Sequence, residues 1–491
     1  MTTQTVQSPQ SICRFAIARA DITPPLGIYH RMWGAAIHDR SAGVHRPLTA
    51  TAMLFQSCDA EFTKDNFQVL IALDHCLFSV KELTALLKAC RESSGIDAEA
   101  IAVTFSHTHA AGLMLLDRES EPGGEMIPDY LRELNSTVAS LVVKCQQELQ
   151  PVTITYGFGS CNLAAHRDYF DASAEQYVCG FNPTTEADDT VVVARVTNGQ
   201  DKVLATVVNY ACHPTTLAWD NQMISPDYPG AMREVVEQAS GAPCVFIQGA
   251  CGDLGPRQGF VGDVEVADQN GRQLGFAVLS AIESLPPPQT QFNYQGPVVS
   301  GATIGTWSHV PVSKEQSVQL KQWRVRRQKV AVRYRDGLPT AQQVDAERAK
   351  LLDAEQSAKD CGDQQKARDC RAMVERKTRL FSRLKSLPAG DAFPYEVVVW
   401  RLGDSIWVSV QGEPYNFLQT ELRRRFSEYA IIVASISSHW GPTYLPTADT
   451  YDKGIYQESI AVVRRGCLEQ VIEAVATCIE DLMKCHIEND N

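Results

Sequence analysis

The chain has 491 residues, a formal net charge of −13 at pH 7 and a sequence pI near 5.4. This acidic balance argues against nucleic acid or an anionic membrane surface as the main partner, because both attract concentrated Lys and Arg. Hydrophobic residues make up 44% of the chain and charged residues 21%, which is ordinary for a globular protein and supplies enough apolar material for a large core.

Two further features bear on where the protein resides. The N-terminal segment has no basic region followed by an apolar one, so we expect no secretory signal. The sequence also contains no run of eighteen apolar residues, so we expect no transmembrane helix. The fifteen cysteines are scattered along the chain, and without a signal peptide we expect most to be reduced and many to be buried. These observations predict a cytoplasmic protein.

Strand and helix patterns alternate through the first part of the chain. Apolar and β-branched runs bounded by turn residues predict strands at 15–22, 50–57, 67–75, 101–109, 152–159, 189–197, 203–214 and 243–249. Apolar residues at helical spacing predict helices at 80–93, 127–149, 228–240 and 266–285. Strands that alternate with helices favour an α/β domain built on a large mixed sheet.

Residues 313–387 differ from this pattern. They are rich in Lys, Arg, Glu, Ala and Leu, with glycine only at Gly337 and Gly362, which predicts a long antiparallel helical hairpin inserted into the main domain. Charges of both signs and the absence of an aromatic stacking stripe favour a solvated arm over a nucleic-acid site. Such an arm could also mediate a homodimer.

The chain then returns to the earlier pattern. Strands are predicted at 395–403, 405–412 and 430–436, with a helix at 414–426 and a final helix that ends near Cys485. The predicted fold is therefore α/β, a large mixed β-sheet flanked by helices, with the helical hairpin inserted into a single domain of residues 1–491.

The stretch FSHTH at 105–109 places two histidines two residues apart at the end of a predicted strand. Residues i and i+2 of a strand point to the same face, so His107 and His109 can face one pocket at the end of the sheet, where α/β folds bind ligands. A local pair of structural histidines explains the same pattern. A metal site needs further ligands from elsewhere in the chain.

Two more segments offer such ligands. His213 ends the strand predicted at 203–214, and Glu413 follows a strand and a glycine just ahead of a predicted helix. Two neutral imidazoles and a carboxylate suit a catalytic zinc ion that keeps a position for water. Both residues also have a structural explanation, since a histidine at a strand end is often structural and a carboxylate at a helix start can cap that helix.

Two loops complete the set of candidate segments. Residues 439–456 form a loop rich in Gly, Pro, Thr and aromatic residues, which either packs over the edge of the core or lines a substrate cleft. The turn at 249–256 carries three glycines whose N–H groups could bind an anionic oxygen, although it lacks the spacing of a phosphate-binding loop. In this turn Asp253 either orients a histidine or caps the turn, and Cys251 is either a small core residue or a nucleophile.

Six segments occur in this order along the chain: ARADITPPLG, SHTHAAG, NYACHP, FIQGACGDLGPRQG, GEPYNFLQTELRRR and TYLPTADTYDKGIYQES. Together they resemble the hallmark segments of the neutral (non-lysosomal) ceramidase family, from about Phe15 to Tyr456. The resemblance implies a neutral-ceramidase-like catalytic domain that hydrolyses an amide and holds one zinc ion.

The resemblance also implies roles for individual positions. His109 is expected beside the reacting centre, Arg167 in contact with the reacting group, and Tyr456 at the close of the aromatic loop. The implied zinc ligands are two histidines, a glutamate and a tyrosine: His107, His213, Glu413 and Tyr444.

The chain departs from the family in the glycine turn. Ceramidases carry a serine in a GDxSP turn that is implicated in amide cleavage, whereas here Gly255 occupies the position of that serine. Gly252 and Gly255 are expected to face the substrate oxyanion, and Asp253 is a candidate catalytic residue. The family's signal peptide and C-terminal immunoglobulin-like domain are not recognisable, so the chain is most similar to the shorter bacterial ceramidase-like proteins.

These residues predict a zinc-dependent hydrolase that cleaves a linear amide bond of a small-molecule or lipid-like substrate. Zinc lowers the pKa of a bound water to about 7. His109 could move a proton from that water to the leaving amine, while Arg167 and Tyr456 could stabilise the oxyanion. Two alternatives stay open: an acyl or group transferase that uses the same zinc, and a catalytically inactive, metal-stabilised binding protein.

Overall fold

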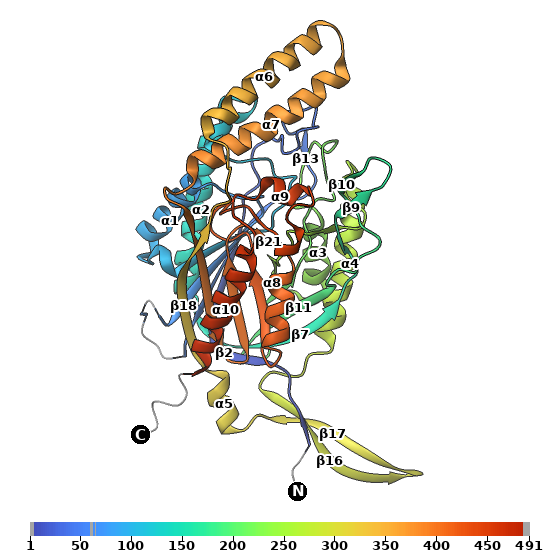
Figure 1. The fold of residues 1–491 in the computed structure, drawn as a ribbon. Helices are drawn as coiled ribbons and strands as arrows, with labels where there is room; N and C mark the ends of the chain where they lie inside the picture. The colour runs from blue at the N-terminus through green and yellow to red at the C-terminus, as the bar shows by residue number, and fades with distance from the viewer. Residues whose placement is uncertain (1–3, 59–61, 64, 485–491) are drawn as a thin grey trace.

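The computed structural model describes residues 4–58, 62–63 and 65–484. A helical hairpin projects from one end of the molecule and a long β-hairpin from the other, with the sheets and their covering helices between them (Figure 1). No helix in these described ranges combines the length and the apolar character needed to cross a membrane.

The larger sheet has eight strands and is mixed. The pairs β12–β14 and β5–β6 are parallel, and the other neighbours are antiparallel. In spatial order its strands are β14 (Cys244–Gln248), β12 (Val203–Tyr210), β11 (Thr190–Asn198), β7 (Gln150–Ser160), β2 (Gln10–Asp21), β4 (Thr49–Gln56), β5 (Phe67–Leu73) and β6 (Ile101–Phe105).

This sheet coils until its two edge strands, β14 and β6, contact each other. Neighbouring strands twist by about 20–25° each, so eight strands turn the first edge toward the last. The segment that follows β22 (Ala430–Ala434) closes the gap, since Ser435 N–H donates to the Gln248 carbonyl at 2.9 Å and Ser438 N–H to the Val103 carbonyl at 2.7 Å. The coil therefore brings together the loops that follow β6 and β12.

The smaller sheet has four strands, and its two faces pack on different partners. Alternate residues of a strand point to opposite faces, so Val397 and Val399 pack toward the outer helices while Trp400 and Trp407 pack against the larger sheet. The Trp407 ring lies 5.1 Å from that of Phe55 in β4. The strands and outer helices are β18 (Trp323–Arg333), β19 (Ala392–Leu402), β20 (Ser405–Val410), β22, α8 (Phe417–Arg425) and α10 (Cys467–Lys484).

Four helices cover the other face of the larger sheet, so the layers run helix, sheet, sheet, helix. They are amphipathic, and their apolar sides form the largest core with the inward residues of β2, β4, β5 and β6. The helices are α1 (Val80–Ser94), α2 (Ile127–Gln147), α3 (Tyr228–Ser240) and α4 (Val264–Glu283).

The projecting helical hairpin consists of α6 (Ala341–Asp360) and α7 (Gln364–Ser386) and connects the adjacent strands β18 and β19. The predicted insertion of 313–387 was therefore wrong at its N-terminal side, where α5 (Lys314–Leu320) is followed by a strand. In β18 the buried residues Val330 and Val332 alternate with exposed ones, Val325 packs on the other side of the strand, and all of β18 pairs with β19. None of the charged residues of β18 is buried, so their number is compatible with a strand at the edge of the sheet.

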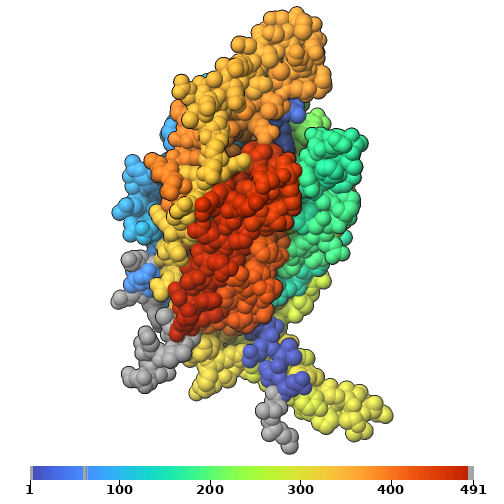
Figure 2. Space-filling view, in the orientation of Figure 1, coloured from blue at the N-terminus to red at the C-terminus, as the bar shows by residue number. Residues whose placement is uncertain are grey.

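A second hairpin, β16 (Thr290–Ser300) and β17 (Ala302–Pro311), extends from the opposite end and is visible in both views (Figures 1 and 2). Residues 290–311 contain no Lys, Arg, Asp or Glu. The remaining short elements are β1 (Thr5–Val6), β3 (Gly43–Val44), β8 (Ala164–His166), β9 (Asp168–Asp171), β10 (Gln176–Cys179), β13 (Met223–Ile224), β15 (Leu254–Pro256), β21 (Glu413–Pro414), β23 (Tyr444–Leu445), α9 (Tyr456–Ile460), η1 (Ala98–Ala100), η2 (Leu116–Arg118), η3 (Gly124–Met126) and η4 (Ala448–Thr450).

The predicted α/β fold with a large mixed sheet flanked by helices is confirmed. Its division into two stacked sheets was not predicted, because strand patterns do not reveal which strands share a sheet. Ten of the fourteen cysteines in the described ranges are buried, as expected. The predicted end of the last helix, Cys485, lies outside the described residues.

Candidate metal centre

The two histidines of the FSHTH stretch lie beyond the end of β6, not on the strand as expected. His107 has a φ of 66°, in the left-handed region, and its N–H donates to the His75 carbonyl at 3.0 Å. The Nε2 atoms of His107 and His109 lie 3.5 Å apart, with ring centroids separated by 4.9 Å. The rings converge because the backbone turns sharply, and strand alternation is not the cause.

His213 reaches the same point from the loop after β12. Its Nδ1–H donates to the carbonyls of Cys251 at 2.7 Å and Leu254 at 3.1 Å. The His107 Nδ1–H likewise donates to the Cys76 carbonyl at 2.7 Å. Because Nδ1 of each ring donates to a backbone carbonyl, the ring orientation is fixed and the lone pair of each Nε2 is available to bind a metal ion. This is the usual arrangement of metal-binding histidines.

Glu413 faces both of these nitrogens. Its Oε2 lies 3.0 Å from His213 Nε2 and 3.5 Å from His107 Nε2, and the ligand atoms of the three residues all fall within 4.8 Å of one another. The strands β21 and β23 pair in parallel with Glu413 opposite Tyr444, whose ring stacks at 6.3 Å from His213 and is 5% exposed. The nitrogen and carboxylate donors present fit a zinc ion.

The protonation states of these side chains suit a divalent cation. Burial raises the pKa of the Glu413 carboxyl, but His107 and His213 outweigh burial and hold that pKa well below 4.5. Burial lowers the pKa of His213 to about 4 and, with the neighbouring imidazoles, lowers that of His109 well below 6.5. Burial also disfavours charge on His107, but Cys76 and Glu413 raise its pKa well above 6.5, so an ion bound at His107 Nε2 would replace a proton.

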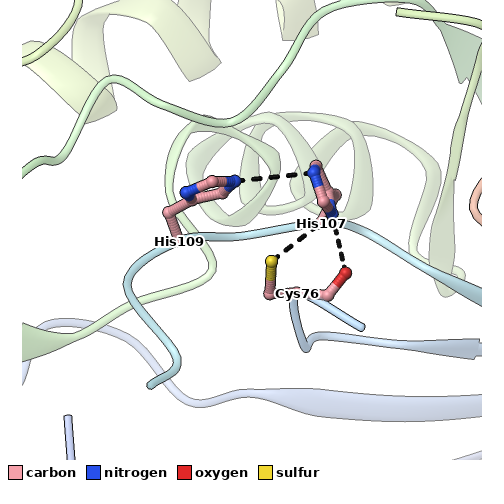
Figure 3. A group of neighbouring side chains, drawn as sticks. All are labelled: Cys76, His107 and His109. Atoms are coloured by element: carbon pink, nitrogen blue, oxygen red, sulfur yellow. Dashed lines mark hydrogen bonds between the residues drawn. The ribbon is translucent and has the colours of Figure 1, made fainter. Parts of the chain in front are cut away.

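A second group of three potential ligands shares His107, as Figure 3 shows. Cys76 Sγ lies 3.5 Å from His107 Nδ1, and His109 contacts the other nitrogen of the ring. Because that Nδ1 carries the proton donated to the Cys76 carbonyl, it is not a metal ligand. Cys76 therefore orients His107, and within the described ranges His107, His213 and Glu413 are the group that fits one ion.

His109 stands beside this group without joining its compact set of ligand atoms. Its ring packs on Trp33 with centroids 5.1 Å apart, and its centroid lies 6.2 Å from that of His213. A neutral imidazole next to the proposed ion, held by an indole, is placed to accept a proton.

Arg167 and Tyr456 lie on the side of Tyr444. The Arg167 guanidinium donates to the Gly252 carbonyl at 2.6 Å and sits 5.3 Å from the centroid of the Tyr444 ring. Tyr456 begins α9, is 43% exposed, and its ring lies 5.9 Å from that of Tyr444. Both residues line the same pocket as His107.

The glycine turn is structural at Gly252 and Asp253. Gly252 N–H donates to the Pro414 carbonyl at 2.9 Å. It is therefore not free to bind the substrate oxyanion, contrary to the expectation from the sequence. The Asp253 carboxylate accepts from Asn416 N–H at 2.7 Å, lies 3.6 Å from His166 Nδ1, and does not line the pocket. Of its two predicted roles, these contacts favour holding the turn against the start of α8.

Gly255, which stands where the resemblance places a serine, has room for a Cβ. A Cβ built on Gly255 would lie 3.7 Å from Thr215 Oγ1 and 4.0 Å from Arg167 Cδ, which are ordinary contacts. Cys251, the alternative nucleophile, is fully buried, and burial raises the pKa of its thiol well above 9.0. A buried neutral thiol is a poor nucleophile.

The centre opens into a pocket of about 460 Å³, a volume typical of small-molecule sites. One wall consists of the aromatic residues Trp33, Trp219, Phe260 and Trp440. The helical hairpin contributes a second set of lining residues, all from α7: Ala372, Glu375, Arg376, Arg379, Ser382 and Arg383. Sequence reasoning missed both walls, since no local motif marks the aromatic residues and α7 was interpreted as a solvated arm.

These features define an α/β protein with a buried His–His–Glu centre that borders a pocket. The crystal structure of neutral ceramidase from Pseudomonas aeruginosa matches with a TM-score of 0.61 at 14% identity, over 96% of this chain and 73% of that chain. A ceramidase complexed with C2 matches with a TM-score of 0.62 at 14% identity, over 98% and 76%. No protein-family model and no curated protein matches the sequence. The chain has a neutral-ceramidase-like fold, as its sequence motifs predicted.

Proposed function

We propose that the protein is a zinc-dependent hydrolase that cleaves a linear amide bond with water. The observation that carries the proposal is the convergence of His107, His213 and Glu413 from three distant segments, with His107 and Glu413 lining one pocket. The similar solved structures are named ceramidases, which supports an amide, small or lipid-like, as the substrate.

The residues that would hold the ion are two histidines through Nε2, a carboxylate and a phenol: His107, His213, Glu413 and Tyr444. When bound, zinc supplies Lewis-acid activation of a water molecule and of the substrate carbonyl. The ionised Glu413 and the neutral His213 are in the protonation states that this role requires.

The other side chains handle protons and charge. His109 accepts a proton at Nε2 from the attacking water and delivers it to the leaving nitrogen, which its low pKa in the buried site permits because the ring is neutral at pH 7. Arg167 and Tyr456, on the Tyr444 side of the pocket, stabilise negative charge on the carbonyl oxygen.

Direct attack by water is favoured over an acyl-enzyme. Gly255 leaves no hydroxyl at the position of the family serine, and the Cys251 thiol is buried and neutral. The turn therefore offers neither a hydroxyl nor an ionised thiol as a nucleophile.

The test combines metal analysis with two variants. Purified protein should contain one zinc ion per chain, His213→Ala should lose it, and His109→Ala should keep it while losing hydrolysis of N-acyl amides by at least about a hundredfold. Product formed in ¹⁸O-labelled water should carry the label in the released acid. Absence of zinc contradicts the proposal, unlabelled product supports a transferase, and metal-loaded protein without turnover supports a binding protein.

A further inference from the structure

One face of α7 forms a wall of the pocket. Residues 375, 376, 379, 382 and 383 recur at helical spacing, so they share one side of the helix, and all of them line the pocket. Three of these positions are arginines. A helix that was expected to be a solvated arm instead presents a row of guanidinium groups to the proposed active site.

The arginines of this wall differ in their partners. Glu375 accepts two hydrogen bonds of 3.0 Å from Arg118 and one of 2.8 Å from Arg379 Nε, so one carboxylate serves two cations. Arg383 has no carboxylate within ion-pair distance in the described ranges, and its buried Nε has no hydrogen-bond partner there. Burial lowers the pKa of Arg383, and the nearby Tyr456 and Glu413 only partly offset this effect.

The pocket as a whole has a surplus of positive charge. Its lining includes five arginines and three carboxylates, and one of these carboxylates is Glu413 of the metal centre. A guanidinium that is withdrawn from water without a partner is costly, and an anion bound beside it removes that cost. Arginine also binds carboxylates through paired hydrogen bonds, which makes this wall complementary to a carboxylate.

The wall beside His109 has the opposite character. Trp33 packs against the His109 ring, against Trp219 at 6.1 Å and against Phe260 at 5.7 Å. These rings offer an apolar surface for a flat or aliphatic group. The metal centre, the aromatic residues and the arginines of α7 share one pocket, because His107, Trp33 and Arg383 all line it.

We propose that the substrate is an amide with an apolar group on one side and a carboxylate on the other, as in an N-acyl amino acid, and that Arg383, next to Arg379, binds the carboxylate. This inference rests on the proposed amide hydrolysis and adds the chemical class of its substrate. It assigns the helical hairpin a role in substrate selection.

The test uses two probes that differ in one charge, N-benzoylglycine and N-benzoylglycinamide, with the zinc-loaded full chain. Arg383→Met should raise KM for N-benzoylglycine by about ten- to a hundredfold and leave kcat nearly unchanged. This factor is typical of the loss of a hydrogen bond to a charged group. KM for N-benzoylglycinamide should not change. Arg383→Lys should recover part of the loss, and Arg368→Met, at an exposed position of the same helix, is the matched control.

Two results overturn the inference. An equal fall in kcat for both probes in Arg383→Met would mean that Arg383 stabilises the transition state of any amide. Equal KM values for both probes in the wild type would mean that no carboxylate site exists. If neither probe is hydrolysed, their binding is measured by calorimetric titration. Binding of N-benzoylglycine that is lost in Arg383→Met supports the carboxylate site even though the proposed hydrolysis fails. Equal binding of both probes, or binding of neither, overturns the carboxylate site.

Discussion

Replacing Glu375 by Gln should loosen the attachment of the helical hairpin to the body of the protein. Glu375 on α7 is 4% exposed and holds Arg118 of η2 by two hydrogen bonds of 3.0 Å. Arg118 is itself buried, so the variant leaves a guanidinium with only the peripheral carboxylate of Asp117 at 3.5 Å. Removing one partner of a buried ion pair destabilises a protein more than replacing both partners, because it leaves one buried charge without compensation.

The expected cost follows from the charge on Glu375. Burial alone would raise its pKa, but Arg379 and Arg118 outweigh burial and lower the pKa from 4.5 to about 2. That difference corresponds to about 3 kcal/mol of stability, close to the roughly 3–5 kcal/mol measured when buried pairs are broken. Because the folded pKa is lowered, this contribution is complete above about pH 4.5 and is lost as the pH falls toward 2.

Urea unfolding of wild type and Glu375→Gln between pH 7 and pH 3 measures this difference. The gap in unfolding free energy should be about 3 kcal/mol at pH 7 and should shrink as the pH falls below 4.5. Glu347→Gln, which removes an exposed pair with Lys377, should cost less than about 1 kcal/mol. A gap below about 1 kcal/mol at pH 7, or one independent of pH, would refute this reasoning.

Four further outcomes follow from the structure. Gly255→Ser should fold with stability within about 1 kcal/mol of the wild type, because its Cβ meets nothing closer than 3.7 Å; a large loss in thermal unfolding would contradict this expectation. Gly252→Ala should cost about 1–3 kcal/mol, because its Cβ would lie 2.5 Å from the Glu413 carbonyl, and an unchanged melting temperature would disprove this. Trp407→Ala should cost about 3–5 kcal/mol in urea unfolding by opening the interface between the sheets, whereas a cost below about 1 kcal/mol would show that the interface repacks. Chelation of zinc should lower the melting temperature of the wild type but not of His213→Ala, and equal shifts would place the ion elsewhere.

Most strands and helices of this fold could be predicted because their apolar residues recur with the period of a strand or a helix, and these residues are the ones that are buried. β19 is an example, since Val397 and Val399 face one core while Trp400 and Leu402 face the other. β18 was missed because five of its eleven residues are charged and occupy unburied positions of an edge strand. In the interpretation of this segment as a helix, its high content of charged residues was given more weight than the alternation of buried and exposed residues.

The candidate ligands could be found from motifs, but their convergence could not be derived from them. His107 follows the edge strand β6 and His213 follows β12, which neighbours the other edge strand β14, and the two residues meet because the sheet coils on itself. The arginine wall had no sequence signal, because Arg379 and Arg383 look like any charged residues of a solvated helix until α7 is placed over the pocket. Tertiary packing decides both features.

The order in which the ligands occur along the chain affects when the centre can form. His107 emerges early from the ribosome, whereas Glu413 and Tyr444 are among the last segments to be translated. A nascent chain therefore has no complete set of the proposed ligands until Glu413 and Tyr444 have been translated. The proposed zinc ion would bind after that point, and C-terminal truncation before Glu413 would remove the carboxylate ligand while leaving both histidines in place.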